Sequence, residues 1–299
     1  IDNNLQNFLD KNTDKKIVVI YGPTACGKTA ISIDIAKMLD TEIISTDSRQ
    51  IFKYMDIGTA KINKDEMKGV KHHMIDIIEP NQAYSVGEFK VATMEIIEKL
   101  WKLGKIPILC GGTGLYIDSI IYDFSIPKVP ANNELRLSLE KEAKEFGNEY
   151  VYDKLVRLDP EYAKTTHPNN LRYVIRAIEV KTMTGVAKTE SIKEKNLKYN
   201  TFFVNPYDGD RQKLYDRIDK RVYIMLEQGL IEEVKKLLDM GYKGSDFGMK
   251  TIGYKEIISH LNGDISLDEA ISEIQQNSRN YAKRQLTWFG KYDKFIEIQ

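Results

Sequence analysis

Cysteine is scarce in this sequence: Cys26 and Cys110 are the two among 299 residues, and no C-x-x-C pair occurs. Disulfide-built domains and zinc ribbons need more cysteines at shorter spacing, so both classes are excluded. No apolar run approaches the roughly 20 residues that a membrane-spanning helix requires. Residues 1–16 mix charges and contain no apolar stretch of the signal-peptide kind. These absences predict a cytoplasmic protein without a membrane partner.

Net charge is absent as well, because 44 basic side chains are balanced by 44 acidic ones. A nucleic-acid partner would therefore need a local basic patch, since the chain as a whole has no basic surplus. The hydrophobic content of 42% is ordinary for a soluble chain that forms one large domain or two modest ones. Composition alone leaves the function open.

Short runs rich in β-branched residues alternate with segments of helical spacing in the N-terminal part of the chain. Such alternation is typical of an α/β fold with a parallel sheet. Helices are predicted at 29–39 and 86–103. Buried strands are predicted at residues 16–21, 42–46, 73–77 and 106–110.

From about residue 123 the strand signal stops. Charged helices are predicted over 133–146, 150–158 and 170–184, with Asp159 and Pro160 opening a short helix between the last two. The next strand signal is at 201–204. We therefore predict a P-loop NTPase-like α/β core of residues 1–122 and 201–299, interrupted by an all-helical insertion of residues 123–200.

The C-terminal part is predicted to be mainly helical. Residues 210–228 carry an apolar stripe at helical spacing. Ser266 and Glu269 form a capping-box pattern for a helix that runs to about residue 289. Residues 295–298 are predicted as a last strand.

One motif has a specific chemical meaning because a predicted strand precedes it and a predicted helix follows it. It fits the pattern G-x-x-x-x-G-K-S/T of a P-loop. The backbone N–H groups and the helix N-terminus bind phosphate oxygens, the lysine adds a full charge, and the threonine hydroxyl can hold Mg²⁺. The motif consists of Gly22, Pro23, Thr24, Ala25, Cys26, Gly27, Lys28 and Thr29.

Most P-loops bind a nucleoside triphosphate, so a kinase or NTPase is the first hypothesis. That hypothesis needs a strand that ends in an aspartate for the metal ion. Asp47 is the best candidate, but the polar residues Ser48, Arg49 and Gln50 follow it. The strand predicted at 106–110 leads into Gly-Gly-Thr113-Gly-Leu-Tyr, which has no carboxylate.

The order of several unusual blocks resembles the tRNA dimethylallyltransferase family of bacterial type. The resemblance extends from about residue 16 to 298. The blocks are 22–29, 47–50, 55–61, 72–76, 84–86, 111–116, 159–160, 167–170, 176–180, 214–218, Arg221, 229–230, 252–256 and 281–289.

This resemblance implies transfer of a dimethylallyl group to the exocyclic N6 of the adenosine on the 3′ side of a tRNA anticodon. The P-loop would then hold the diphosphate of dimethylallyl diphosphate, with Mg²⁺ as cofactor. The insertion would help to enclose the anticodon stem-loop. A monomer is expected, because one core and one insertion can enclose one stem-loop.

The resemblance also assigns roles to residues. Asp47 is the expected base for N6, and we place it just past a strand beside the P-loop strand, where α/β sheets bind ligands. Lys28, Mg²⁺ and an arginine would stabilise the leaving diphosphate, with Arg217 as first choice and Arg221 as second. Thr113 matches a position that contacts the target nucleotide.

RNA contacts are expected in three places. Ser48, Arg49 and Gln50 are candidate readers of base edges. Tyr173 stands where the family often has an arginine, which weakens that contact. The candidate phosphate contacts are Arg136, Arg172 and Arg176 in the insertion and Lys283 and Arg284 near the C-terminus. For Arg172 and Arg176, a solvated, salt-bridged helix face is the alternative.

Three other functions stay open at this point. An isopentenyltransferase acting on free adenine nucleotides would share the chemistry but would not need the helical insertion. A small-molecule kinase would transfer a phosphoryl group from ATP. An RNA-binding protein with a structural P-loop would bind without turnover. Cys26 replaces the usual serine of the loop, and a thiol at a helix N-terminus raises the hypothesis of sensitivity to oxidants.

Overall fold

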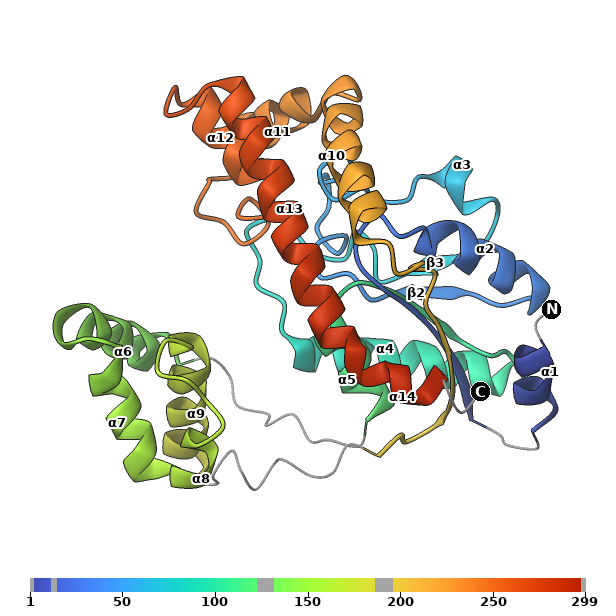
Figure 1. The fold of residues 1–299 in the computed structure, drawn as a ribbon, viewed down its shortest axis with the longest axis horizontal. Helices are drawn as coiled ribbons and strands as arrows, with labels where there is room; N and C mark the ends of the chain where they lie inside the picture. Colours follow the sequence, from blue (N-terminus) through green and yellow to red (C-terminus); the bar gives the residue numbers. More distant parts are fainter. Residues whose placement is uncertain (1–2, 12–14, 123–131, 186–195, 297–299) are drawn as a thin grey trace. The chain divides into compact units, whose positions relative to one another are not determined.

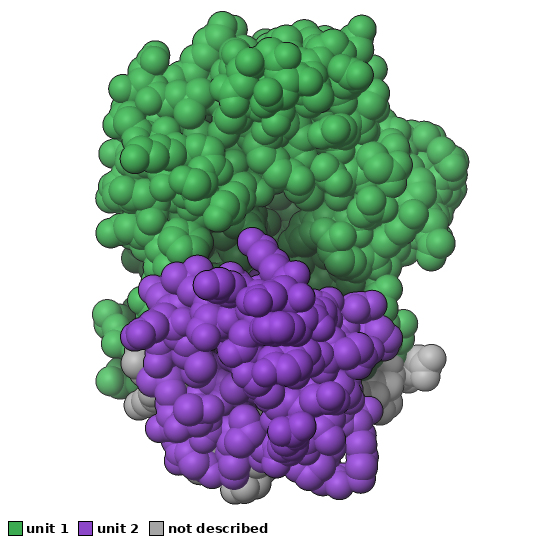
Figure 2. All heavy atoms as spheres, turned by 90° about the vertical axis from the view of Figure 1, so that its left-hand side faces the viewer, with its two compact units in different colours: residues 1–121, 197–299 green, residues 122–196 purple. Residues whose placement is uncertain are grey.

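The computed structural model describes residues 3–11, 15–122, 132–185 and 196–296 (Figure 1). The chain divides into two compact units, one of residues 1–121 with 197–299 and the other of residues 122–196 (Figure 2). Residues 197–200, predicted as part of the insertion, belong to the first unit. The reason is that strand β5 begins at Asn200 and the Lys198 amide donates a hydrogen bond to the Ile121 carbonyl (2.8 Å).

The first unit is built on a sheet of five parallel strands in the order β3-β2-β4-β1-β5. Residues 17–21 of β1 are fully buried, as expected for a strand covered on both faces. Four of the five predicted strands that precede the C-terminal one are confirmed. The strand predicted at 73–77 is wrong beyond His73, because Met74 and Asp76 have left-handed backbone conformations that end the strand. The bounds of the strands are β1 (Lys16–Tyr21), β2 (Ile43–Ser45), β3 (His72–His73), β4 (Ile108–Gly111) and β5 (Asn200–Val204).

The strand that precedes Asp47 was predicted to lie beside the P-loop strand, and this prediction is wrong. Asp47 follows β2, and β2 pairs with β3 and β4 but not with β1. Strand β4 lies between β1 and β2, with Val18 opposite Ile108 on one side and Ile43 opposite Ile108 on the other. Both P-loop and Asp47 still lie at carboxyl ends of parallel strands, and these ends share one edge of the sheet.

Four helices of the first unit, namely α2, α4, α10 and α13, begin within one residue of their predicted starts. Ser85 and Glu88 form a capping box at the start of α4, and Ser266 and Glu269 do the same for α13. Helices α10 and α13 pack against each other (Figure 1). The helices are α1 (Asn3–Asp10), α2 (Lys28–Met38), α3 (Lys64–Met67), α4 (Val86–Lys102), α5 (Gly114–Ile121), α10 (Arg211–Glu227), α11 (Leu230–Asp239), α12 (Tyr254–Leu261), α13 (Leu267–Phe289) and α14 (Asp293–Ile296).

Two terminal segments differ from the prediction. The strand predicted at 295–298 is wrong, because residues 293–296 form α14; residues 297–298 lie outside the described part. Phe295 of this helix stacks on Phe203 of β5, with ring centroids 5.1 Å apart. At the other end, the polar start of the chain contains the unpredicted helix α1, because Leu5 and Phe8 are both buried against the sheet.

The second unit contains four helices in its described residues, and their predicted positions are confirmed to within two residues. Their apolar sides enclose a separate core that includes Val151, Leu155 and Val174, all fully buried. The helices are α6 (Asn133–Phe146), α7 (Asn148–Leu158), α8 (Pro160–Ala163) and α9 (Leu171–Thr184). Asp159 caps α8 by accepting from the Tyr162 amide (3.1 Å). In the described parts of both units, no helix has the length and apolar character to cross a membrane.

Candidate active site

The P-loop joins the end of β1 to the start of α2. Its tight turn depends on left-handed backbone conformations, with φ of 141° at Gly22, 63° at Ala25 and 92° at Gly27. At Gly22 a side chain is also excluded by space, because a Cβ atom would lie 2.9 Å from the Cys26 Sγ. At Gly27 there is space for a Cβ, so its requirement for glycine is conformational.

The Lys28 side chain folds back over this loop. Its ammonium group donates hydrogen bonds to the carbonyl oxygens of Gly22 (3.0 Å) and Pro23 (2.7 Å). Lys28 also lines a cavity of about 370 Å³, so its charge lies at the wall of that cavity. This is the placement that the P-loop pattern predicts for a phosphate-binding lysine.

The cavity is bounded by several segments that converge on the P-loop. Thr24 and Thr29 contribute from the loop and the start of α2. The carboxyl ends of β2 and β4 contribute Asp47 and residues 110–112, and the segment at 59–60 closes another side. Helices α10 and α13 supply the last group of lining residues, namely Arg221, Tyr281 and Gln285.

Asp47 lies two residues past the end of β2, partly buried in the cavity wall. Its Oδ1 accepts a hydrogen bond from the Arg49 amide (2.8 Å), which fixes the side chain in an Asx-type turn. A carboxylate with one oxygen held by a backbone amide keeps acceptor capacity on the other oxygen. Asp47 can therefore accept a proton from a group bound in the cavity.

Thr113 holds the turn that carries Asp47. Its amide donates to the Thr46 carbonyl (3.0 Å), and its hydroxyl oxygen accepts from the Ser48 amide (3.0 Å). The two contacts lie on either side of Asp47 in the chain. In the structure Thr113 therefore positions the candidate base, a contact that the sequence did not indicate.

The three residues after Asp47 differ in their surroundings. The Gln50 side-chain amide lies in the cavity wall, where Nε2 donates to the Ala60 carbonyl (3.2 Å) and Oε1 lies 3.4 Å from the Ser45 hydroxyl. Arg49 is exposed, and its Nη1 lies 3.5 Å from the Phe247 carbonyl. Ser48 contacts Thr113. Of the three, Arg49 has the side chain that is most open to a large partner.

The segment that carries Ala60 is fixed by a partly buried network of hydrogen bonds. The Glu233 carboxylate accepts from three successive amides, those of Asp56 (3.0 Å), Ile57 (2.8 Å) and Gly58 (3.2 Å). It also accepts from the Tyr254 hydroxyl (2.5 Å). Successive N–H groups that converge on one carboxylate form an anion nest, which here anchors the wall of the cavity to α11.

The two candidate arginines of α10 have different environments. The Arg221 Nη1 donates to the Thr24 hydroxyl (3.1 Å) and its side chain lines the cavity. Burial lowers the pKa of Arg221, although nearby Asp47 opposes that shift, and an arginine stays charged at neutral pH. The Arg217 side chain is 50% exposed and pairs with Asp208 at 3.8 Å, and it does not line the cavity. The structure thus favours Arg221, the second choice from the sequence.

Tyr281 and Gln285 are site residues that the sequence analysis missed. They lie one turn apart on α13, so both face the cavity. Burial raises the pKa of Tyr281 to about 12, with a further contribution from the charge of Asp47. One sequence signal could have identified Gln285: this polar residue lies on the same face of the helix as the buried residues Ala282 and Phe289. Lys283 and Arg284 lie on the same helix but are exposed.

Cys26 is buried, with 4% of its surface exposed, and it packs against Leu214, Ile218 and Ala282. The Lys28 Nζ also lies 3.9 Å from the Cys26 sulfur, but a thiol so little exposed is less accessible to a dissolved oxidant than the sequence suggested. Burial raises the pKa of the second thiol, Cys110, to about 11. The structure therefore does not favour the hypothesis of an oxidant-sensitive P-loop.

Two of the arginines of the helical unit are held by one carboxylate. Glu179 is fully buried and accepts a bidentate pair of hydrogen bonds from Arg136 (both 2.8 Å) and a further bond from Arg176. Burial by itself would raise the pKa of Glu179, but these bonds lower it to about 2. Arg172 and Tyr173 are exposed on α9. For Arg176, the structure therefore favours a salt bridge on the helix over a contact with RNA. Arg136 is paired with the same carboxylate.

Replacing Glu179 by glutamine is expected to lower the free energy of unfolding by about 2 kcal/mol or more at pH 7, because the two arginines lose their counter-charge. The pKa of Glu179 is lower in the folded chain than the ordinary 4.5, so its stabilisation is present above pH 4.5. The difference between wild type and variant should shrink as the pH falls from about 4.5 towards 2. Urea unfolding across this range measures it, with the exposed Glu145→Gln as control; a constant difference would contradict the ion-pair role.

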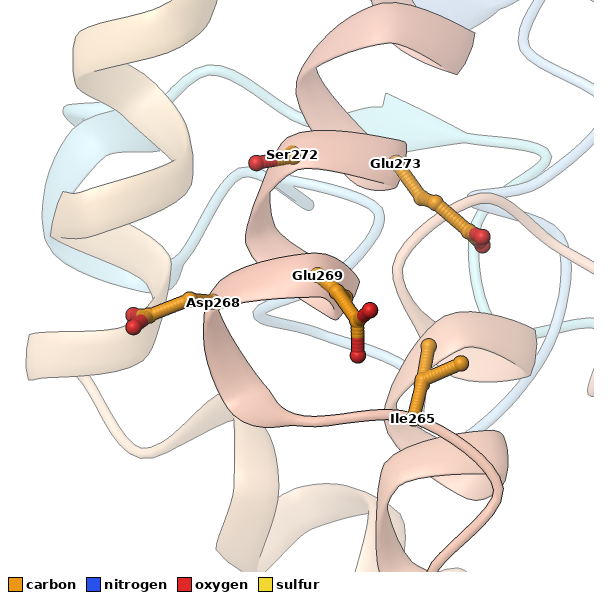
Figure 3. Close-up of a pocket in the computed structure, with 5 residues that line it drawn as sticks. All are labelled: Ile265, Asp268, Glu269, Ser272 and Glu273. Atoms are coloured by element: carbon orange, nitrogen blue, oxygen red, sulfur yellow. The ribbon is translucent and has the colours of Figure 1, made fainter.

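A second hollow lies at the N-terminal end of α13, lined by Ile265, Asp268, Glu269, Ser272 and Glu273 (Figure 3). Glu269 is engaged in the capping box with Ser266 (2.8 Å). Acidic side chains repel a diphosphate, and no lysine or arginine lines this hollow. Glu269 and Gln285 are 16 positions apart on one helix, or roughly 24 Å, so the hollow is remote from the P-loop.

Known proteins are similar to this chain over most of its length. A family model described as IPP transferase matches residues 50–292, a segment that begins three residues past Asp47 and does not include the P-loop. The chain is 52% identical over 281 residues to the tRNA dimethylallyltransferase of Alkaliphilus oremlandii, covering 93% of this chain and 90% of that protein. It is 49% identical to the enzyme of the same name from Acetivibrio thermocellus, covering 94% and 91%.

Solved structures are similar as well. The full-length tRNA isopentenylpyrophosphate transferase of Bacillus halodurans is 43% identical with a TM-score of 0.67, covering 93% of this chain and 87% of that one. A eukaryotic dimethylallyltransferase acting on tRNA is 30% identical with a TM-score of 0.80, covering 92% of this chain and 70% of that one. Because these similarities extend over most of its length, the chain belongs to the IPP transferase family.

Proposed function

We propose that this chain transfers the dimethylallyl group of dimethylallyl diphosphate to N6 of the adenosine on the 3′ side of a tRNA anticodon, releasing diphosphate. One observation carries the proposal: Lys28, Arg221 and Asp47 line the same cavity. Two cations suit a leaving diphosphate, and a carboxylate suits an amine that must lose a proton. The names of the relatives support the same reaction.

The donor half of the site is the P-loop. The amides at the start of α2 and the ammonium group of Lys28 bind the diphosphate oxygens, and Arg221 adds a second full charge beside Thr24. As the bond between the allylic carbon and the diphosphate oxygen breaks, negative charge grows on that oxygen. Groups that are already in place stabilise this charge without reorganisation, which lowers the barrier.

The acceptor half of the site is the turn at Asp47. Adenine N6 is a weak nucleophile because its lone pair is delocalised into the ring. In the proposed step N6 forms a bond to the allylic carbon, the carbon–oxygen bond to diphosphate breaks, and Asp47 accepts the proton that N6 loses. A base in the anticodon loop must leave its stack to reach such a cavity, as enzymes that modify bases require.

The residues present fit a magnesium ion as cofactor. Thr29 lines the cavity in the first turn of α2, and hydroxyl and diphosphate oxygens are ligands that Mg²⁺ prefers. The described residues contain no cluster of three His, Cys, Asp or Glu side chains for a metal, so the remaining ligands would be diphosphate and water. When bound, the ion would neutralise charge on the diphosphate.

Removing Mg²⁺ with a chelator is expected to abolish transfer, and added Mg²⁺ should restore it. Thr29→Val, which has no hydroxyl, should raise the Mg²⁺ concentration needed for half-maximal activity by about tenfold or more. Thr29→Ser keeps the hydroxyl and serves as the matched control. Full activity of the chelated enzyme, or equal metal requirements of the two variants, would contradict a role for Thr29 in metal binding.

Contacts with RNA are proposed where basic or aromatic side chains are exposed. Arg49 follows Asp47 directly, and Lys283 and Arg284 lie on the exposed side of α13. In the helical unit, Arg172 and Tyr173 are exposed, whereas Arg136 and Arg176 pair with Glu179. We therefore favour Arg172 and Tyr173 over the paired arginines as contacts with the stem-loop. A monomeric state and a cytoplasmic location, where tRNA is modified, complete the proposal.

A direct assay tests the function. The protein is incubated with Mg²⁺, dimethylallyl diphosphate and either unmodified tRNA or AMP, and the prenylated adenine is detected by mass. We expect product on tRNA. Product on AMP alone would support the free-nucleotide alternative, and phosphoryl transfer from ATP without prenylation would support a kinase.

A further inference from the structure

The side chain of Gln285 connects the two halves of the cavity. Its Oε1 accepts a hydrogen bond from the Thr24 amide of the P-loop (2.8 Å), and its Nε2 donates to the Gly112 carbonyl at the end of β4 (2.9 Å). It is separated from these partners by 261 and 173 positions in the sequence. With 5% of its surface exposed, Gln285 is held by both contacts in a buried position.

Each partner of Gln285 belongs to a different part of the proposed chemistry. Thr24 lies in the diphosphate-binding loop, and its hydroxyl also contacts Arg221. Gly112 directly precedes Thr113, whose amide and hydroxyl fix the turn of Asp47. A single side-chain amide therefore forms hydrogen bonds both to the donor loop and to the segment that holds the acceptor base.

Space around Gly112 supports the same role. A Cβ atom at Gly112 would lie 2.2 Å from the Gln285 Nε2, far inside contact distance, whereas its next neighbour outside Gln285, the Gly22 carbonyl oxygen, would be 3.7 Å away. Gly112 does not have a left-handed backbone conformation that would require glycine. The absence of a side chain at this position is thus explained by the approach of Gln285.

We propose that Gln285 is a positioning residue, which sets the spacing between the diphosphate-binding loop and the turn that presents Asp47. The Thr24 amide is used for this bond and is not available to a phosphate oxygen, unlike the amides that follow it in the loop. The expected effect of Gln285 on dimethylallyl transfer rests on the proposed function. Its effect on diphosphate binding can be measured independently of that function.

A double-mutant cycle tests the role in transfer. Gln285→Ala is expected to lower kcat at least tenfold while the Kd for tRNA changes less than twofold. Gly112→Ala should cause a similar loss, because the new methyl group displaces Gln285. In the double variant the shortened side chain removes the clash, so its activity should lie within about threefold of Gln285→Ala. Activity of Gln285→Ala within twofold of wild type, or losses that multiply, would overturn the proposal.

Diphosphate binding provides the second measurement, by calorimetry with inorganic pyrophosphate and no tRNA. Gln285→Glu has the same size and still accepts from Thr24, but it cannot donate to Gly112 and brings a negative charge to the loop. Its affinity for pyrophosphate should fall at least tenfold, and unchanged affinity would overturn the proposal even if wild type failed to prenylate tRNA. Gln276→Ala, exposed on the same helix, is the matched control and should bind and turn over as wild type does.

Discussion

Replacing Asp47 by asparagine is expected to lower kcat for prenylation by about 10²–10⁴-fold, the usual contribution of a general base. Asparagine has the same shape, and its carbonyl oxygen can still accept the 2.8 Å hydrogen bond from the Arg49 amide. The turn after β2 is therefore preserved, and only the ability to accept a proton is lost. Single-turnover rates with saturating tRNA and donor measure the effect.

Binding of tRNA separates this role from a structural one. We expect the Kd of tRNA for Asp47→Asn to stay within about threefold of wild type, because the variant keeps the shape and contacts of the turn. Asp34→Asn, on the exposed face of α2, controls for the loss of one negative charge. Equal losses in turnover and in tRNA affinity would mean that Asp47 positions the RNA instead of accepting the proton.

Replacing Arg221 by alanine is expected to lower kcat/KM for dimethylallyl diphosphate by about 10²–10³-fold, the range seen when one group that stabilises a developing negative charge is removed. Arg221 lines the cavity and contacts Thr24 at 3.1 Å, where water screens its charge little. Initial rates at saturating tRNA and varied donor concentration give this value. Arg221→Lys should recover part of the activity, because it restores the charge without the planar fork.

Arg217→Ala is the comparison that decides between the two arginines. Arg217 lies one turn earlier on the same helix, is half exposed, and pairs with Asp208. Exposed ion pairs contribute little, so we expect kcat/KM to change less than about threefold. A larger loss of kcat/KM for Arg217→Ala than for Arg221→Ala would mean that Arg217, the first choice from the sequence, stabilises the leaving diphosphate.

Short-range patterns explain why much of the fold was predictable. The P-loop was identifiable because its function depends on one continuous turn between a strand and a helix. The helix start at Ser266 was equally clear, since a capping box is formed by residues three positions apart. The failure at 295–298 has the opposite origin: a short apolar segment fits a strand or a helix, and its contact with Phe203 decided the outcome.

Within the site, the sequence by itself determined the phosphate-binding loop and a carboxylate at the end of a strand. Only the tertiary structure decided that β4 separates β1 from β2, because strand order depends on pairing between distant segments. The tertiary structure also decided that Arg221 and not Arg217 lines the cavity, that a carboxylate pairs with Arg136, and that Gln285 belongs to the site. Each of these depends on a partner that lies far away in the chain, and local residue patterns contain no information about such partners.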